Sequence, residues 1–312
     1  MTMAREWAIL TTESAYGTLT DTPVLNTDYI ALRLDQGNSL TIRKTPAQQV
    51  IRTHDTLNRR AFRHSERYSV GGTIRCLAYA THLPLLLPWA LQPINGAQDS
   101  PWTTTEQPND LASCTLDHTM EDSSGNLIKT RYSGLKVASG ELVFNNQTDI
   151  GVLTLQVVGK SATTHSQTEP AYTAYPSDVY CLQDLTTFKI ASATTNFRQF
   201  TVRWNNMLRS RYDEAATLSS CRMRGRDLDY EAVLLLKSSP ARRTAFEGLT
   251  AQDCEFVWNN GSNTMTFDFN GNSYIDSIQP ETTPLEDEFE QTLLLHSHYD
   301  GSAGTDLSLS FT

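Results

Sequence analysis

The feature that most restricts how this chain can fold is a regular alternation of apolar and polar residues in many short segments. The stretch RYSGLKVASGELVFNNQTDIGVLTLQVVGK (131–160) alternates, turns in a short polar loop, and alternates again. The segment 199–208 likewise places Phe200, Val202 and Trp204 on one face. Successive side chains of a strand point to opposite faces of a sheet. The alternation therefore predicts a mainly β protein in which 131–160 is a long hairpin.

Turn residues between the alternating segments predict two further hairpins. Segments 28–36 and 38–44 flank Gly37, and 263–278 turns at Asn270-Gly271, a dipeptide that favours tight hairpin turns. Segments 289–301 and 304–312 are expected to be the last two strands. Many short strands separated by turns are typical of β-sandwiches and barrels.

Helix signals are few, and they predict two short helices. The first lies in the apolar segment 84–92. The second spans 240–248, where Ser239 can cap the helix, Pro240 suits its first position and Gly248 can end it.

A weak internal repeat suggests two related domains. Each expected helix follows a strand that begins near a glycine, Gly72 or Gly225, and these glycines lie 153 positions apart. Later segments of the first half resemble segments that lie about 140 positions further along the chain. This predicts tandem β domains at 1–165 and 166–312, with a Thr/Ser/Pro-rich boundary at 161–178. Alternating strands resemble each other easily, so a chance likeness is the alternative.

Charge and composition argue against several classes of function. The 312-residue chain has a formal net charge of −10, which disfavours binding to nucleic acid by phosphate neutralisation. Its five cysteines contain no Cys-x-x-Cys pair, which favours buried free thiols in a reducing cytoplasm. The most apolar run, 83–91, is interrupted by prolines and is too short to cross a bilayer. We therefore expect no contact with a membrane.

Candidate catalytic and metal-binding residues are sparse. His296 and His298 share a face of a strand near Asp300 and are the best metal ligands on offer, but no third ligand is placed by the sequence. His54 and His64 lie in an arginine-rich stretch and read as solvated loop residues. None of the nucleophile, zinc-protease or phosphate-loop motifs occurs. We expect no enzyme activity, no metal and no cofactor.

The sequence contains two arginine clusters and an acidic C-terminal region. Between 244 and 312 there are twelve acidic residues and no Lys or Arg. This asymmetry suits head-to-tail self-association, in which a basic face of one copy meets an acidic face of the next. Two ordinary solvated faces are the alternative. The candidate contacts are Arg59, Arg60, Arg63, Arg67, Arg209, Arg211, Arg222, Arg224, Glu286, Asp287 and Glu288.

Several segments together resemble the major tail tube protein of long-tailed, siphovirus-like bacteriophages. The opening AREWAILTTESAYGTLTDTPV has the family's acidic residue before Tyr16-Gly17-Thr18. The segment YSVGGTIRCLAYATHLPLLLPWAL resembles its glycine-led strand and apolar helix. The segment 114–162 resembles its strand, Tyr-Ser-Gly turn and hairpin ending in Gly-Lys, and FRQFTVRWNNML resembles a strand that ends before a long loop.

This resemblance implies a structural virion protein that assembles into stacked rings and forms the conduit for DNA during ejection. The long hairpins would contribute strands to the lumen, which we expect to be net negative so that DNA slides without sticking. Implied partners are other copies of the chain, a tape-measure protein, and tail terminator and distal tail proteins. The implied location is the tail of the virion, assembled in the host cytoplasm.

The tandem repeat further predicts a ring of three chains with pseudo-sixfold symmetry, whereas a single tube domain with an outer decoration would need six chains. Two other functions stay open. One is another ring component of a phage tail or contractile machine built on the same fold, such as a distal-tail ring, a baseplate ring or a secretion tube. A cytosolic β-sandwich binding module is the remaining alternative.

Overall fold

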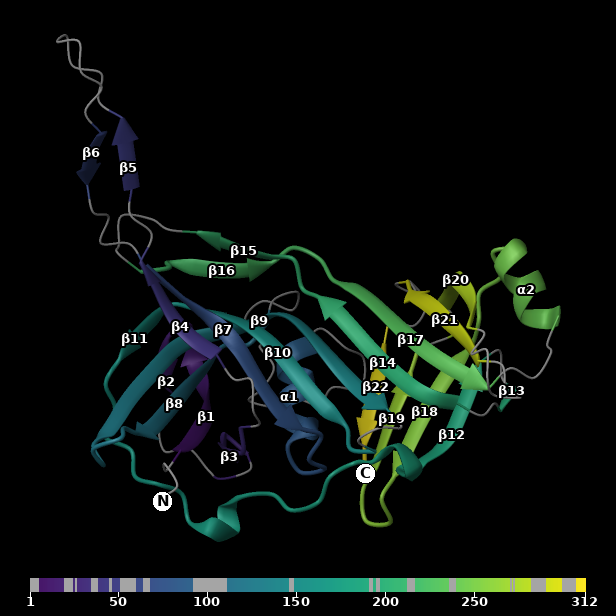
Figure 1. Ribbon diagram of the computed structural model, residues 1–312, viewed down its shortest axis with the longest axis horizontal. Coiled ribbons are helices and arrows are strands. Elements are labelled where there is room, and N and C mark those ends of the chain that lie inside the picture. The colour runs from purple at the N-terminus through teal and green to yellow at the C-terminus, as the bar shows by residue number, and fades with distance from the viewer. Residues whose placement is uncertain are drawn as a thin grey trace.

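The structure is a computed structural model in which most of the chain is described, and Figure 1 shows its arrangement. The described residues are 6–19, 25, 27–34, 39–44, 47–50, 60–63, 68–91, 111–145, 149–190, 193–194, 197–211, 217–235, 240–269, 271, 273–281, 290–298 and 307–312.

The N-terminal half of the chain contains eleven strands and one helix. They are β1 (Glu6–Ala15), β2 (Thr18–Leu19), β3 (Tyr29–Leu32), β4 (Ser39–Lys44), β5 (Ala47–Val50), β6 (Arg60–Arg63), β7 (Tyr68–Leu77), α1 (Leu83–Leu91), β8 (Cys114–Glu121), β9 (Leu127–Asn145), β10 (Val152–Gly159) and β11 (Ser161–Thr163).

Two short 3-10 turns, η1 (Tyr172–Ala174) and η2 (Leu182–Asp184), lead into the C-terminal half. Its elements are β12 (Leu185–Ile190), β13 (Ala193–Thr194), β14 (Phe197–Asn205), β15 (Leu208–Arg211), β16 (Ser220–Met223), β17 (Asp227–Leu235), α2 (Pro240–Glu247), β18 (Cys254–Asn259), β19 (Thr264–Asp268), β20 (Ser273–Glu281), β21 (Glu290–Ser297) and β22 (Ser308–Phe311).

One antiparallel run of eight strands extends through both halves in the order β4–β7–β10–β9–β14–β17–β21–β20. Strand β9 is 19 residues long, so it belongs to two pairings. Its first part pairs with β8 and β11, and its second part pairs with β10 and β14. A separate five-stranded sheet has the order β13–β12–β18–β19–β22. The long run therefore joins the two halves, and in Figure 1 the hairpins β5–β6 and β15–β16 lie above it.

The second half repeats the pairing order of the first. Strand β1 pairs with β3 and β8 as β12 pairs with β13 and β18. Strand β10 lies between β7 and β9 as β21 lies between β17 and β20. The hairpin β5–β6 is inserted between β4 and β7, and β15–β16 is inserted between β14 and β17. The last strand of each half also corresponds, because β11 pairs with β9 and β22 pairs with β19.

The core is continuous from one half to the other. Leu10, Trp89 and Phe144 of the first half are buried in the same cluster as Phe256 and Trp258 of the second. The rings of Phe144 and Trp258 are stacked with centroids 4.7 Å apart, so the halves share packed aromatic side chains as well as a sheet. Burial of such large apolar surfaces is the main source of stability in a fold of this size.

The mainly β prediction is confirmed, and so are the two short helices, each within about one residue of its expected limits. The long hairpin is confirmed as β9–β10. The predicted face of Phe200, Val202 and Trp204 is buried, because these side chains of β14 point into the core.

The two smaller hairpins were wrong. Strand β3 pairs with β1, and β4 pairs with β7, so the described parts of the segments around Gly37 do not pair with each other. Gly271 does adopt a positive φ of 68°, but the turn carries the chain from one sheet to another: β19 pairs with β18 and β22, and β20 pairs with β21. Turn residues identify a reversal of the chain, whereas the choice of partner strand depends on distant segments.

Candidate assembly surfaces

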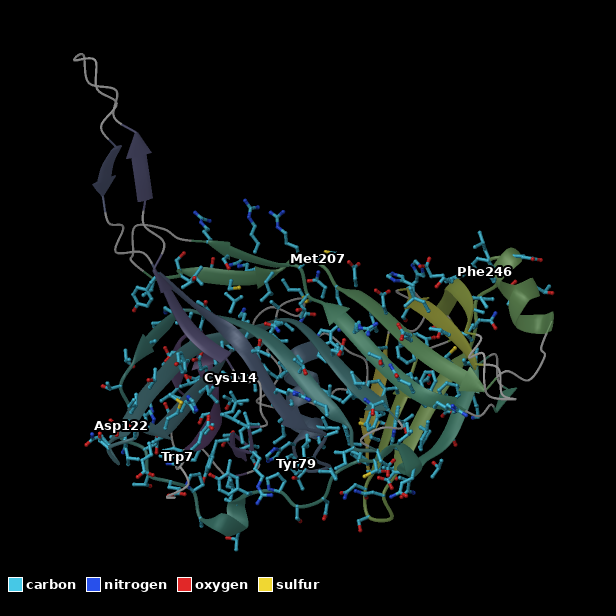
Figure 2. All side chains as sticks on the ribbon, viewed as in Figure 1. Trp7, Tyr79, Cys114, Asp122, Met207 and Phe246 are labelled. Atoms are coloured by element: carbon cyan, nitrogen blue, oxygen red, sulfur yellow. The ribbon has the colours of Figure 1, made fainter. Side chains whose placement is uncertain are left out.

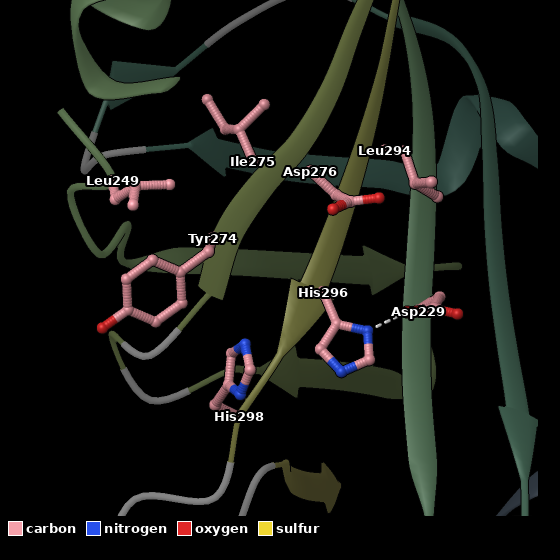
Figure 3. A pocket seen from close by; sticks show the side chains of 8 residues that line it. All are labelled: Asp229, Leu249, Tyr274, Ile275, Asp276, Leu294, His296 and His298. Atoms are coloured by element: carbon pink, nitrogen blue, oxygen red, sulfur yellow. Dashed lines mark hydrogen bonds and ion pairs between the residues drawn. The ribbon is translucent and has the colours of Figure 1, made fainter. Parts of the chain in front are cut away.

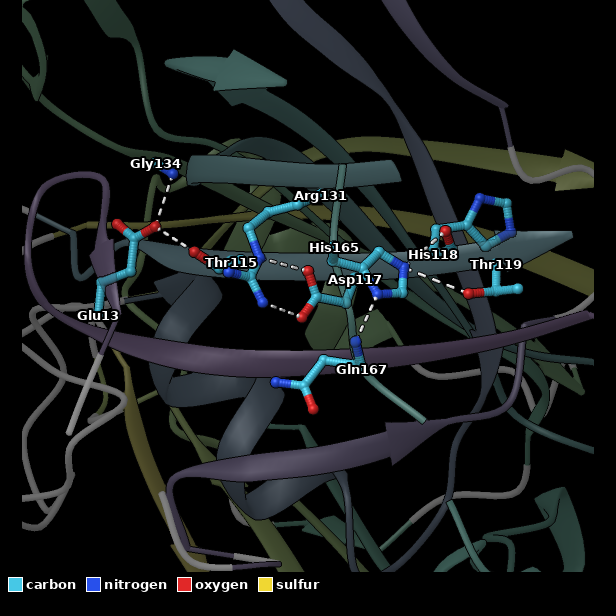
Figure 4. Close-up of polar contacts among 9 residues, drawn as sticks. All are labelled: Glu13, Thr115, Asp117, His118, Thr119, Arg131, Gly134, His165 and Gln167. Carbon is cyan, nitrogen blue, oxygen red and sulfur yellow. Dashed lines mark hydrogen bonds and ion pairs between the residues drawn. The ribbon is translucent and has the colours of Figure 1, made fainter. Parts of the chain in front are cut away.

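The carboxylate of Glu13 on β1 brings together three segments that are far apart in the sequence (Figure 4). Its Oε1 accepts hydrogen bonds from the Thr115 hydroxyl at 2.6 Å and from the Gly134 N–H at 2.7 Å. Its Oε2 accepts the Gly17 N–H at 2.6 Å. Glu13 precedes the Tyr16-Gly17 turn, and Gly134 ends the Tyr-Ser-Gly motif, which lies within the strand β9. The motifs singled out in the sequence therefore meet at one place, which we call the Glu13 joint.

Lys160, the residue after β10, completes the Glu13 joint. Its ammonium donates to the Tyr16 carbonyl at 3.1 Å and lies 5.3 Å from the centre of the Tyr16 ring. Gly17 and Gly134 have positive φ angles of 79° and 70°. A Cβ at Gly17 would come within 2.7 Å of the Lys160 side chain, and one at Gly134 within 2.6 Å. Only glycine combines this backbone conformation with so close an approach.

The Glu13 joint holds the point at which β9 passes from its pairing with β8 to its pairing with β10. The Lys160 N–H donates to the Ser133 carbonyl at 2.8 Å, immediately before Gly134 bends the strand. Here the hydrogen-bonded groups fix the shape of the backbone, and none of them is arranged as a nucleophile with a base. The joint is therefore a structural device.

A second buried polar group lies on the same part of β8 (Figure 4). Arg131 makes a bidentate ion pair with Asp117, with both N–O distances at 2.7 Å. This hydrogen bonding raises the pKa of Arg131. His165 accepts the Gln167 N–H at Nδ1, which leaves its Nε2 to carry the proton and face the His118 carbonyl at 3.2 Å. All of these groups are satisfied by neighbours within the chain.

The junction between the halves is formed by β9 and β14. Arg203 on β14 bridges Glu141 on β9, at 2.7 Å, and Glu231 on β17, at 3.2 Å. On the core face, Trp204 lies directly against Gly140, where a Cβ would be only 2.2 Å from the indole. The side-chain amide of Asn206 donates to the carbonyls of Ala90 in α1 and Val137 in β9. The second half therefore covers the helix of the first.

The inserted hairpin β15–β16 carries the second arginine cluster on an exposed ribbon. Arg209 and Arg222 are direct cross-strand partners, and Arg211 lies opposite Ser220. Arg209, Arg211, Arg222 and Arg224 are all exposed. Figure 2 shows nitrogen-tipped side chains projecting outward from this hairpin. Like charges directly opposite each other, such as Arg209 and Arg222, destabilise an isolated pair of strands.

The first arginine cluster is described only in part. Arg60 and Arg63 lie on β6, in the hairpin inserted at the corresponding position of the first half. In Figure 1 this hairpin extends away from the body of the molecule. Arg59, Arg67, Glu286, Asp287 and Glu288 lie outside the described residues, so their expected contacts stay predictions.

The histidine pair of the last long strand lines a pocket of about 820 Å³ together with side chains of β17 and β20 (Figure 3). His296 is bonded through Nδ1 to Asp229, and its ring meets that of His298 edge-on at 4.8 Å. Among the described residues there is no group of three His, Cys, Asp or Glu side chains placed to hold a metal. Asp300 lies outside them. The lining residues are Asp229, Leu249, Tyr274, Ile275, Asp276, Leu294, His296 and His298.

A comparison with protein families connects this architecture to a known role. The family model of the phage tail tube protein matches residues 9–311. The chain belongs to the phage tail tube family. No curated protein matches the sequence closely enough to be compared.

Membership of this family establishes a structural tail tube protein that self-assembles into the conduit for DNA, associates with other tail components and is part of the virion tail. The resemblance drawn from the sequence is therefore confirmed. The family is structural and is not known for enzymatic activity. In the described part of the chain, neither helix has the length and apolar character needed to span a membrane.

Sequence reasoning found the motif segments but missed what they do. The acidic residue before Tyr16-Gly17 was noticed without a role, and Asn206 was given none, although Glu13 holds the Glu13 joint and Asn206 closes the junction. The available signal was the position of Glu13 before a tight Tyr-Gly turn. Apart from Gly17, the partners of both residues lie more than 60 positions away, so these contacts leave no local pattern.

Proposed function

We propose that three copies of this chain form each ring of the tail tube, with pseudo-sixfold symmetry, and that the rings stack. In this proposal residues 1–165 and 166–312 are two tail-tube domains derived by tandem duplication. The observation that carries it is the repeated pairing order, in which the helix, the inserted hairpin and every strand of β1–β11 except β2 have a counterpart among α2 and β12–β22. Six equivalent positions around a ring then need only three chains.

The exposed face of the eight-stranded run supplies the lumen in this proposal, and we expect its net charge to be negative. The described ion pairs at the junction support this sign, because Arg203 is shared by two carboxylates, Glu141 and Glu231. A surface of this sign repels phosphate and releases DNA readily. Tape-measure, terminator and distal tail proteins are the proposed partners, and assembly takes place in the host cytoplasm.

The inserted hairpins β5–β6 and β15–β16 are proposed to reach neighbouring copies. Their support is the exposed arginine ribbon of β15–β16, and the proposed acceptors are acidic segments such as 286–288. Such contacts join charges of opposite sign and weaken as salt is added.

Electron cryomicroscopy of purified chain tests the ring. Tubes whose reconstruction has threefold symmetry, with two slightly different domains alternating around the ring, are the expected result. Six identical chains related by sixty-degree rotations would overturn the trimer while leaving the tube. Monomers alone, under conditions that favour assembly, would contradict self-assembly itself.

A further inference from the structure

We propose that the outer edge of β20 pairs, antiparallel, with the outer edge of β4 in a second copy of this chain, in the register that β9 and β14 use within the chain. The proposal rests on the proposed ring and specifies which surfaces close it. Within the described residues, β4 pairs with β7 alone, and β20 has one full partner, β21, besides a single bridge from Gln252 to Ser273.

The two outer edges are the ends of the eight-stranded run, and each corresponds to a strand that is paired at the junction. In the second half β20 pairs with β21, as the second part of β9 pairs with β10 in the first half. In the first half β4 pairs with β7, as β14 pairs with β17 in the second half. Figure 1 shows β4 and β20 on opposite sides of the molecule, so one chain cannot join them itself.

A shared β-bulge aligns β20 with β9 residue by residue. In the β9–β10 pairing the register shifts between Gln156 and Val157, which leaves Ala138 of β9 unpaired. In the β20–β21 pairing the shift leaves Asp276 of β20 unpaired. A bulge is a specific feature of a strand. Matching the two bulges places Ile278 at the position of Gly140 and Gln279 at that of Glu141.

The neighbouring pairings align β4 with β14 in the same way. Val157 on β10 faces Gly72, and its counterpart Leu295 on β21 faces Tyr230. Gly72 in turn faces Leu40, and Tyr230 faces Val202. Counting along these strands then gives the register between copies. The predicted pairs are Ser277 with Arg43, Ile278 with Ile42, Gln279 with Thr41, Pro280 with Leu40, and Glu281 with Ser39.

The residue types at the predicted pairs are compatible with this register. Within the chain, the core-face pair is a glycine and a tryptophan, Gly140 and Trp204. Between copies it becomes two isoleucines, which divide the apolar volume more evenly. The charged pair Glu141 and Arg203 becomes the neutral pair Gln279 and Thr41, so no like charges meet. Pro280 lacks an N–H and removes one hydrogen bond from the ladder.

Exposed apolar side chains beside β20 also favour a partner that covers them. Helix α1 packs on β9 and is buried, and its Ala90 carbonyl accepts a hydrogen bond from Asn206 of the second half. Helix α2 packs on β20. Phe246 in α2 is 37% exposed, and Leu249, just after the helix, is 74% exposed. Figure 2 shows Phe246 at this outer end of the molecule. A neighbouring copy that pairs with β20 would cover these apolar side chains as the second half covers α1.

Disulfide trapping tests the register. Thr41→Cys and Gln279→Cys are introduced together, the protein is assembled, and mild oxidation is followed by a non-reducing gel. We expect covalent dimers and trimers that disappear on reduction, because directly opposite Cβ atoms lie close enough to bridge. The matched control combines Gln279→Cys with Arg43→Cys, on the same face of β4 but out of register, and is expected to give no covalent oligomer. The wild-type chain controls for its own five cysteines.

The outcomes separate this inference from the proposed ring. Rings or tubes that form with no covalent oligomer from the in-register pair, or with the control pair linking instead, would overturn the pairing and leave the assembly standing. Absence of any assembly from the wild-type chain would overturn both.

If the double variant does not assemble, hydrogen exchange of wild-type protein replaces it. Amides of 39–43, 277–279 and 281 are expected to exchange more slowly in tubes than in unassembled chains. Unchanged exchange in both segments would refute the pairing.

Discussion

Single residues with no chemical role determine how closely the two halves approach. Gly140 allows the indole of Trp204 to lie against the β9 backbone, and the Asn206 amide donates to the carbonyls of Ala90 in α1 and Val137 in β9. Substitutions at these positions should therefore change the free energy of unfolding.

Replacing Gly140 by alanine is expected to destabilise the chain by about 1–3 kcal/mol, because the new methyl group overlaps the Trp204 ring. Gly225→Ala is the matched control. Its Cβ would meet only the Met207 sulfur at 3.5 Å, so we expect a change within about 0.5 kcal/mol. Urea denaturation of both variants gives the comparison. Equal stabilities would contradict the close contact at the junction.

Glu13→Gln tests the Glu13 joint. A glutamine amide presents its NH₂ group to at least one of the three donors that Glu13 accepts, so we expect a loss of about 2–3 kcal/mol in the free energy of unfolding. Thr115→Val removes a single neutral donor and leaves the carboxylate two N–H partners. It is expected to cost about 1 kcal/mol. A Glu13→Gln variant as stable as wild type would show that the joint does not depend on charge.

His82 makes stability depend on pH. The imidazole is 1% exposed, neither of its ring nitrogens has a hydrogen-bond partner among the described residues, and burial lowers its pKa to about 4. In the unfolded chain the pKa is about 6.5, so the unfolded state binds the proton first. Stability is then complete above about pH 6.5 and falls by up to about 3 kcal/mol as the pH approaches 4.

His82→Phe should remove this part of the pH dependence, measured as the free energy of unfolding between pH 4 and 7. His298→Gln, at an exposed position, should retain it. The same slope in wild type and His82→Phe would assign the pH dependence to other groups.

At the scale of elements, the sequence predicted what depends on local pattern and failed where distant partners decide. The buried face of Phe200, Val202 and Trp204 follows from a period of two, and the second helix from Ser239, Pro240 and Gly248. The hairpin at Asn270-Gly271 failed because its two strands join different sheets. The contacts of Glu13 span 102 and 121 positions, which no local signal reports.

The arginine ribbon β15–β16 gives a prediction for assembly. Arg222→Glu together with Arg224→Glu is expected to block polymerisation at moderate salt and leave the fold unchanged, because both side chains are exposed. Lysine at the same two positions retains the charge and should still assemble. Electron microscopy and circular dichroism measure the two properties separately. Full-length tubes from the glutamate variant would show that these arginines are only solvated.

At the scale of the whole molecule, the two halves are alike in pairing order yet share one core. Leu142 and Phe144 on β9, from the first half, lie in the same buried cluster as Phe200 and Phe256 from the second. The β9–β14 pairing adds a ladder of hydrogen bonds across the junction. Loss of either half would expose this apolar surface and a long strand edge at once, which favours aggregation.

The unassembled chain is therefore expected to unfold in a single cooperative step. Circular dichroism and tryptophan fluorescence should give coincident urea transitions, since the tryptophans report tertiary packing on both sides of the junction, with Trp89 in the first half and Trp258 in the second. A fragment of residues 1–165 should fail to fold alone, because Phe144 would lose the Trp258 ring that covers it. Two separate transitions, or a stable fragment, would mean that each half carries a sufficient core. In that case the shared sheet would join two independent units, and the tube would derive its stiffness from contacts between chains.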